Sequence, residues 1–172
     1  MIRIISLRKA LLAGIVGAFA WELAARLLVL AGVHVFDVVW VTGHMIAQPL
    51  RAYLWWPMGM VMHTAIGIIW AIFYAYFFWS TFRLPHWKQG LIFAIIPALV
   101  AGFIMVPHLV SIHQYLIHQP DYSLGVFAYR LGWGGPVSIV LGHEIYGLML
   151  GLLYNHPVGH RIDSRLMGAL AT

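Results

Sequence analysis

The chain has 172 residues, of which 62% are hydrophobic and only 9% are charged. Because a soluble domain has about 25% charged residues, this composition excludes a soluble protein and leaves no segment for a sizeable soluble domain. Cysteine is absent, which excludes disulfides, thiolate metal sites and cysteine catalysis. The sequence also lacks a His-Glu-x-x-His motif and a nucleophile elbow, so we favour a protein that is not an enzyme.

Four apolar stretches are long enough to cross a bilayer, which requires ~20 helical residues each. They cover residues 7–33, 56–80, 89–109 and 133–155. The predicted fold class is therefore all-α: a polytopic membrane protein with four transmembrane helices in a single domain, residues 1–172. Tryptophans lie near the ends of these stretches, as expected at a membrane interface: Trp55, Trp56, Trp79, Trp87 and Trp133.

The first stretch also has features of a signal peptide. A basic start and an apolar run precede Ala18-Phe19-Ala20, which is typical of a cleavage site before Trp21. However, the apolar character continues well beyond Ala20. We therefore predict an uncleaved first transmembrane helix.

The basic residues are distributed unequally between the two sides of the predicted bundle. Arg51 and Arg130 fall in the connections on the far side, and Arg26 falls within the first helix. The other seven fall on the side of the N-terminus: Arg3, Arg8, Lys9, Arg83, Lys88, Arg161 and Arg165. Because basic residues concentrate in cytoplasmic loops, both termini are predicted to be cytoplasmic. This distribution explains the net charge of +5 without a nucleic-acid partner.

An offset of 80 residues relates the two halves of the chain. One stripe of a helix carries the same residue types twice: His63, Gly67 and Tyr74, then His143, Gly147 and Tyr154. The same offset aligns mostly small residues that favour close helix packing: Gly14, Ala18 and Glu22 with Ala94, Ala98 and Gly102. We predict two repeated helix hairpins, about 8–80 and 88–160, related by an axis along the membrane normal.

Packing roles are predicted for several of these positions. The Gly147-x-x-x-Gly151 spacing is typical of helix contacts, and Tyr74 and Tyr154 are expected to pack at matching places. The two outer connections, 34–55 and 110–132, do not resemble flexible linkers. The first has a mostly polar stripe that predicts an amphipathic helix on the outer membrane surface: His34, Asp37, Val41, His44 and Gln48 opposite Val35, Val38, Val39 and Ile46. In the second, Pro120 is expected to end a short helix.

Three costly polar residues come out at one depth in the membrane. With a rise of 1.5 Å per residue, Glu22, His63 and His143 all lie ~10 Å below the outer surface of the hydrocarbon core. Arg26 lies one turn nearer the outside, where it can pair with Glu22 or extend towards the headgroups. Ionisable residues inside a membrane require an explanation, so this level is the candidate site.

Several kinds of site fit these residues. His63 and His143 can be axial ligands of haem b, with Gly67 and Gly147 leaving room for the ring and Arg26 near a propionate. Alternatively, His63, His143 and Glu22 can hold a divalent metal ion, or the histidines can line a quinone or proton site. The simplest interpretation is structural, since polar side chains in membranes often only hydrogen-bond neighbouring helices.

The outer connections contain a second group of histidines. Together with Asp37 and Asp121 they can form a metal-binding face: His34, His44, His108, His113 and His118. Their spacings match no standard metal site, so we favour faces of interfacial helices instead.

The segment from His143 to Tyr154, with its His-x-x-Tyr-Gly-x-x-x-Gly pattern, resembles the last helix of the YagU-like group of small four-helix bacterial membrane proteins. The earlier His63 to Gly67 segment is similar to a second helix of that group. The resemblance covers the four-span layout and is sharp over about 25 residues. It implies a bacterial inner-membrane protein and carries no established activity.

Three functional hypotheses follow from the sequence. The leading one is an accessory or structural subunit that packs against a larger membrane complex, motivated by the missing hydrophilic domain, the 15% aromatic residues and the small-residue faces. The second is a haem- or metal-binding redox protein that uses His63 and His143. The third is a small transporter or proton relay that uses Glu22. The expected partners are the bilayer, bound lipid, and other membrane subunits or further copies of the chain.

Overall fold

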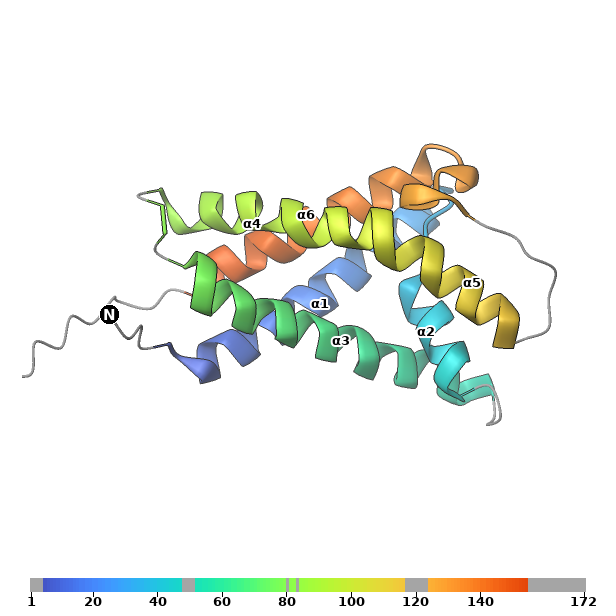
Figure 1. Ribbon diagram of the computed structural model, residues 1–172, viewed down its shortest axis with the longest axis horizontal. Helices are drawn as coiled ribbons and strands as arrows, with labels where there is room; N and C mark the ends of the chain where they lie inside the picture. Colours follow the sequence, from blue (N-terminus) through green and yellow to red (C-terminus); the bar gives the residue numbers. More distant parts are fainter. Residues whose placement is uncertain (1–4, 48–51, 80, 83, 117–123, 155–172) are drawn as a thin grey trace, which may run out of the picture.

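The computed structural model of the chain describes residues 5–47, 52–79, 81–82, 84–116 and 124–154. Every element in these ranges is helical (Figure 1). The α-helices are α1 (Leu7–Leu30), α2 (Val38–Ala47), α3 (Trp55–Phe73), α4 (His86–Val100), α5 (Val106–Leu116) and α6 (Gly134–Leu153). Two π-helical segments, η2 (Tyr74–Phe78) and η3 (Ala101–Met105), continue α3 and α4. Two short 3₁₀ segments, η1 (Ala52–Leu54) and η4 (Val126–Leu131), precede α3 and α6.

Four helical segments in the described residues are long and apolar enough to cross a membrane: Leu7–Leu30, Ala52–Phe78, His86–His113 and Gly134–Leu153. The predictions of an all-helical fold and of four such helices are therefore confirmed. A helix suits these sequences because it satisfies every backbone hydrogen bond within the segment, which a hydrocarbon environment demands.

The third spanning helix is longer than predicted. In Figure 1, α4, η3 and α5 follow one another as one continuous rod, which runs along the upper side of the molecule in α4 and slopes down beside α2 in α5. The span was predicted to end at about Leu109, with a separate short helix after it, but the helix continues to Leu116. Pro97 lies inside α4 and cannot donate its backbone hydrogen bond, and the wider π turn begins at Ala101, one turn later. Pro120 lies outside the described residues.

Small residues bring the long helices into close contact. Helix α1 packs on α3 and α6, and α4 packs on α6. At the α1–α3 contact, a Cβ added to Gly14 would lie 2.8 Å from the Cα of Ile68 and 3.0 Å from the carbonyl oxygen of Gly67. At the α4–α6 contact, a Cβ on Gly90 would overlap the carbonyl of Gly147. No side chain larger than hydrogen fits there without moving the backbones apart.

Two of these contacts occupy positions that are 80 residues apart. Gly14 meets Gly67 between α1 and α3, and Ala94 meets Gly147 between α4 and α6. Ala18 also approaches Gly67, since its Cβ would lie 3.3 Å from a Cβ added there. The correspondence is what a duplicated hairpin would give, although the duplication itself stays a prediction.

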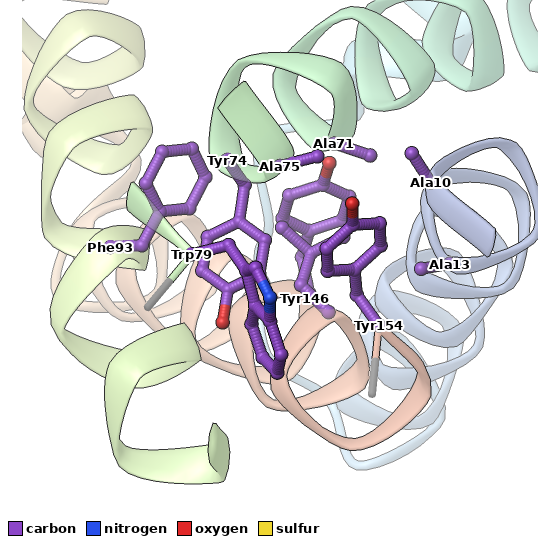
Figure 2. Close-up of a cluster of buried hydrophobic side chains, with 10 residues drawn as sticks. Ala10, Ala13, Ala71, Tyr74, Ala75, Trp79, Phe93, Tyr146 and Tyr154 are labelled. Atoms are coloured by element: carbon purple, nitrogen blue, oxygen red, sulfur yellow. The ribbon is translucent and has the colours of Figure 1, made fainter. Parts of the chain in front are cut away.

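A buried aromatic cluster fills the end of the bundle where α1 begins (Figure 2). The rings of Tyr74, Trp79, Phe93 and Tyr154 pack against one another. The methyl groups of alanines from α1, α3 and η2 face them: Ala10, Ala13, Ala71 and Ala75. The hydroxyl of Tyr154 accepts a hydrogen bond from the backbone N–H of Ser6 at 3.1 Å. This bond joins the end of α6 to the start of α1.

At the opposite end of the bundle, α2 and α5 pack against each other. Helix α2 is contacted by α3 on one side and by α5 on the other (Figure 1). Consequently both Val39 and Val41 are buried, although the sequence analysis placed them on opposite faces of an amphipathic helix. Gly43 and Gly59 allow the close approach, because a Cβ on either would overlap the backbone of the other helix. A second apolar cluster lies here: Phe36, Val41, Val106, Val110, Leu124, Ala128 and Ile139.

Candidate functional site

The two repeated histidines lie on either side of one tryptophan ring. His63 on α3 and His143 on α6 are both only 5% exposed. The Trp21 ring, from α1, lies 4.6 Å from the His63 ring and 4.3 Å from the His143 ring, between ring centroids. The two histidines are therefore brought together around Trp21, a residue that was not a candidate from the sequence.

The hydrogen bonds of these histidines stay within their own helices. Nδ1 of His143 donates to the carbonyl of Ile139, one turn earlier on α6, at 2.7 Å. Nε2 of His63 is buried and has no hydrogen-bond partner. In the described part of the chain, neither imidazole hydrogen-bonds to another helix.

Both histidines line an apolar pocket with a volume of about 80 Å³. This is several times the space that one water molecule requires, so the pocket has room for a small ring or a headgroup. Its lining comes from every long helix and from α2: Ala18, Trp21, Val38, His63, Ile66, Gly67, Trp70, Pro97, Val100, Ala101, Met105, Leu109, His143 and Tyr146. No Asp, Glu, Lys or Arg is among these residues.

Packing and exposure indicate a lateral opening of the pocket, which we call the mouth, between α3 and the α4–η3–α5 rod. These two helices are not among the closely packed pairs, whereas α1 and α6 lie behind them in Figure 1. Lining residues at the mouth, such as Ile66 and Val100, are partly exposed, and Met105 is exposed. The ring contact of Trp70 with Phe93 bridges α3 and α4 near the aromatic cluster and limits the mouth on that side. The mouth therefore lies within the spans rather than at their ends.

The back wall of the pocket is fixed by two aromatic residues that lie over glycines. Tyr146 lies against Gly17, where an added Cβ would be 2.6 Å from the tyrosine ring, and its hydroxyl donates a hydrogen bond to the carbonyl of Gly67. In the reverse direction, Trp21 covers Gly142 so closely that an added Cβ would overlap the indole. Sequence reasoning missed Trp21, Gly142 and Pro97, because nothing in their spacing marks them.

Glu22 belongs to a different group of side chains. Its carboxylate accepts a hydrogen bond from Nε of Arg26 at 2.6 Å, and Nη2 of Arg26 also binds Asp37 at 2.8 Å. Asp37 in turn accepts a bond from the backbone N–H of Trp40 and so caps the start of α2. Glu22 pairs with Arg26, as one of the two alternatives predicted for Arg26, and Arg26 also links α1 to Asp37. Glu22 does not line the pocket.

The predicted metal and haem sites are not assembled. Among the residues that the structure describes, no group of three His, Asp or Glu side chains can hold a metal ion, so His63, His143 and Glu22 do not form the expected set. Gly147 leaves no room for a haem ring, because Gly90 and Ala94 pack directly against it. Arg26 is bound to two carboxylates, and both imidazoles contact Trp21 rather than an open slot. These residues do not fit haem.

The remaining predicted packing residues lie at helix contacts. Gly151 faces the backbone of His86 and Trp87, Ala98 is buried on α4, and Gly102 lies under the ring of Phe127. Gly102 is the counterpart of Glu22 in the predicted repeat. The two positions also differ in what lies beside them. The Arg26–Asp37 pair lies beside Glu22, and the Phe127 ring lies over Gly102.

Two of the outer histidines that the structure describes form a pair, and no metal-binding group of three is found among the described residues. His44 on α2 and His113 on α5 are joined by a hydrogen bond of 2.7 Å between Nδ1 and Nε2, and the Trp40 and Trp55 rings lie against His44. His108 is exposed and bonds to its own helix. His118 and Asp121 lie outside the described residues.

Comparisons of the chain with family models, curated proteins and solved structures found no match.

Proposed function

We propose that this protein binds a membrane-soluble apolar molecule in the lateral pocket between α3 and the α4–η3–α5 rod, with His63 and His143 as its polar anchors. The observation that carries the proposal is a mid-span apolar pocket with two buried imidazoles. Ligand sites are typically apolar cavities with a few convergent polar groups, and this pocket has that composition.

A purely structural role, in which His63 and His143 only hold helices together, explains their hydrogen bonding less well. A histidine that serves only to hold membrane helices together should hydrogen-bond a neighbouring helix. His143 instead bonds to its own helix, and His63 leaves Nε2 unpaired. Burying a polar group without a partner costs free energy, so a bound molecule that supplies the partner would remove that cost.

The adjoining π-helix supports the same proposal. Single π turns inside α-helices occur frequently at functional sites. Here η3 begins at Ala101 and ends at Met105, and both residues line the pocket. Its wider turn follows Pro97, which also lines the pocket. The regular α-helix is therefore interrupted where its residues line the pocket.

The test is to fill the mouth of the pocket from a half-buried position. Ala101→Phe adds a ring at the mouth, whereas Ala65→Phe adds the same ring to the exposed face of α3 outside the lining. Organic extracts of the purified proteins are analysed by mass spectrometry for a co-purified apolar molecule. We expect the wild-type protein and Ala65→Phe to retain it and Ala101→Phe to lose it. Equal retention by both variants would reject the proposal.

A second proposed function is the accessory subunit, and Glu144 is the observation that favours it. Glu144 lies in the middle of α6, is partly exposed, and forms no ion pair with any described residue. A carboxyl group facing lipid is costly, so a donor on a partner helix would stabilise it. We expect Glu144→Leu, but not Leu152→Ala on the same helix, to reduce the size of the particle in a mild detergent. An unchanged size for Glu144→Leu would contradict this proposal.

Orientation, location and ancestry are also proposals. The excess of basic residues on one side supports cytoplasmic termini, and the YagU-like resemblance supports a bacterial inner membrane and the paired hairpins. Because the chain lacks cysteine, single cysteines are clean probes of orientation. A cysteine at Thr81, between α3 and α4, should resist a membrane-impermeant reagent in intact cells, and one at the exposed Val126, between α5 and α6, should react. The reverse pattern would invert the proposed orientation.

A further inference from the structure

The protonation state of His143 is fixed by its hydrogen bond. A carbonyl oxygen can only accept, so Nδ1 of His143 must carry the proton that it donates to Ile139. In the neutral ring, Nε2 is then a hydrogen-bond acceptor. Nε2 of His143 has no partner in the described part of the chain. The pocket therefore offers an acceptor on α6.

The rest of the lining restricts the ligand further. No cationic side chain lines the pocket, so nothing there neutralises a phosphate or a carboxylate. Trp21 and Tyr146 are the aromatic lining residues closest in sequence or space to His143. The hydroxyl of Tyr146 already donates a hydrogen bond to the carbonyl of Gly67. Flat aromatic side chains favour a flat ring in offset or edge-to-face contact. The site therefore suits a neutral ring with a hydrogen-bond donor.

We infer that the ligand of this pocket carries a neutral ring hydroxyl that donates a hydrogen bond to Nε2 of His143, with an apolar tail that leaves through the mouth between α3 and α4. This inference rests on the proposed function, because it names the chemical class that the same pocket binds. A quinol and a long-chain phenol share this chemistry. A quinone, which has only acceptors, would leave Nε2 of His143 unpaired.

Two redox-inert probes separate the hydroxyl from the rest of the molecule. In para-dodecylphenol the ring carries a hydroxyl, and in para-dodecylanisole a methoxy group replaces it. Both are titrated calorimetrically into the full-length protein in lipid nanodiscs. We expect the phenol to bind roughly tenfold more tightly, as one hydrogen bond to a buried acceptor would give. Dodecanol and a ubiquinol with a decyl tail distinguish an aliphatic alcohol from a quinol as the natural source.

A matched pair of variants places the effect at one residue. His143→Phe keeps a ring but removes the acceptor, and we expect the preference for the phenol over the anisole to disappear. His108 makes the same Nδ1 bond to the carbonyl one turn earlier, also at 2.7 Å, but on the exposed face of α5. His108→Phe should therefore keep the preference.

The outcomes distinguish this inference from the proposed function. If both probes bind equally to the wild-type protein and Ala101→Phe abolishes both, the pocket binds apolar molecules but the hydroxyl inference is wrong. Binding of dodecanol as tight as that of the phenol would refute the preference for a ring. If neither probe binds, the proposed function fails as well. The comparison of the phenol and the anisole on the wild-type protein tests the inference even if His143→Phe does not fold.

Discussion

Trp21 of α1 lies directly over Gly142 of α6, and no Cβ fits between them. Four residues away, the arrangement is reversed, since Tyr146 of α6 lies over Gly17 of α1. Each helix thus contributes one ring and one glycine to the same contact. The pair sets the position of the indole that touches both histidines, and the first prediction concerns it.

Gly142→Ala is expected to displace Trp21 and destabilise the protein by about 1 to 3 kcal/mol, as overpacking of a tight contact does. The measurement is equilibrium unfolding in detergent. In a Trp21→Leu background the added methyl group meets a smaller side chain, so the same substitution should cost much less. An equal cost in both backgrounds would show that the Trp21–Gly142 contact does not cause the effect.

The two tyrosines of the predicted repeat should respond differently to loss of their hydroxyls. The Tyr74 hydroxyl is buried without a partner, so Tyr74→Phe should leave stability unchanged or raise it by up to about 1 kcal/mol. The Tyr154 hydroxyl accepts the N–H of Ser6, so Tyr154→Phe should lower stability by about 1 kcal/mol. Thermal unfolding of both variants in one detergent compares them directly. A loss at Tyr74 as large as at Tyr154 would contradict the assignment.

Arg26 is expected to matter more than either of its partners. Arg26→Met removes the group that pairs with the buried carboxylate of Glu22, and it should destabilise the protein by about 1 to 3 kcal/mol. Adding Glu22→Gln removes the unpaired charge and should restore most of that loss. Chemical unfolding of the single and double variants is the measurement. Failure of the second substitution to restore stability would mean that Glu22 does not depend on Arg26.

The α4–α6 contact should tolerate no side chain at Gly90. A Cβ there overlaps the carbonyl of Gly147, which belongs to the backbone and cannot rotate away, so Gly90→Ala should cost about 3 kcal/mol or more. The exposed Ile92, on the same helix, provides the control, since Ile92→Ala should change stability by less than about 0.5 kcal/mol. Similar losses for the two variants in a thermal unfolding assay would argue against the close contact.

The sequence allowed the spans to be predicted because hydropathy depends on composition alone. It also indicated that Gly14, Ala94 and Gly151 lie at helix contacts, since small residues at helical spacing have few other uses in a membrane. The third span was predicted to end at about Leu109, and the helix continues beyond this residue to Leu116 in α5. The side-chain polarity expected at a position depends on whether lipid, protein or water surrounds it. The backbone can remain helical where one of these environments gives way to another.

The candidate site was predictable only in part. The repeated spacing pointed to His63 and His143, and the i,i+4 spacing pointed to the Glu22–Arg26 pair. The second partner of Arg26 is Asp37, which lies beyond the turn between α1 and α2. Spacing within one helix cannot reveal such a partner. Nor could spacing show that the backbone of Gly90 occupies the space beside Gly147, because this contact depends on the register between α4 and α6. The haem hypothesis stays a prediction that the packing around Gly147 does not favour.

The mouth between α3 and the α4–η3–α5 rod has a consequence for how affinity should be expressed. A molecule that reaches the pocket through this mouth comes from the hydrocarbon phase and never has to cross bulk water. Its occupancy then follows its mole fraction among the lipids, and an aqueous dissociation constant mixes partitioning with binding. Diluting a fixed amount of ligand with additional lipid, at constant total volume, would empty the site.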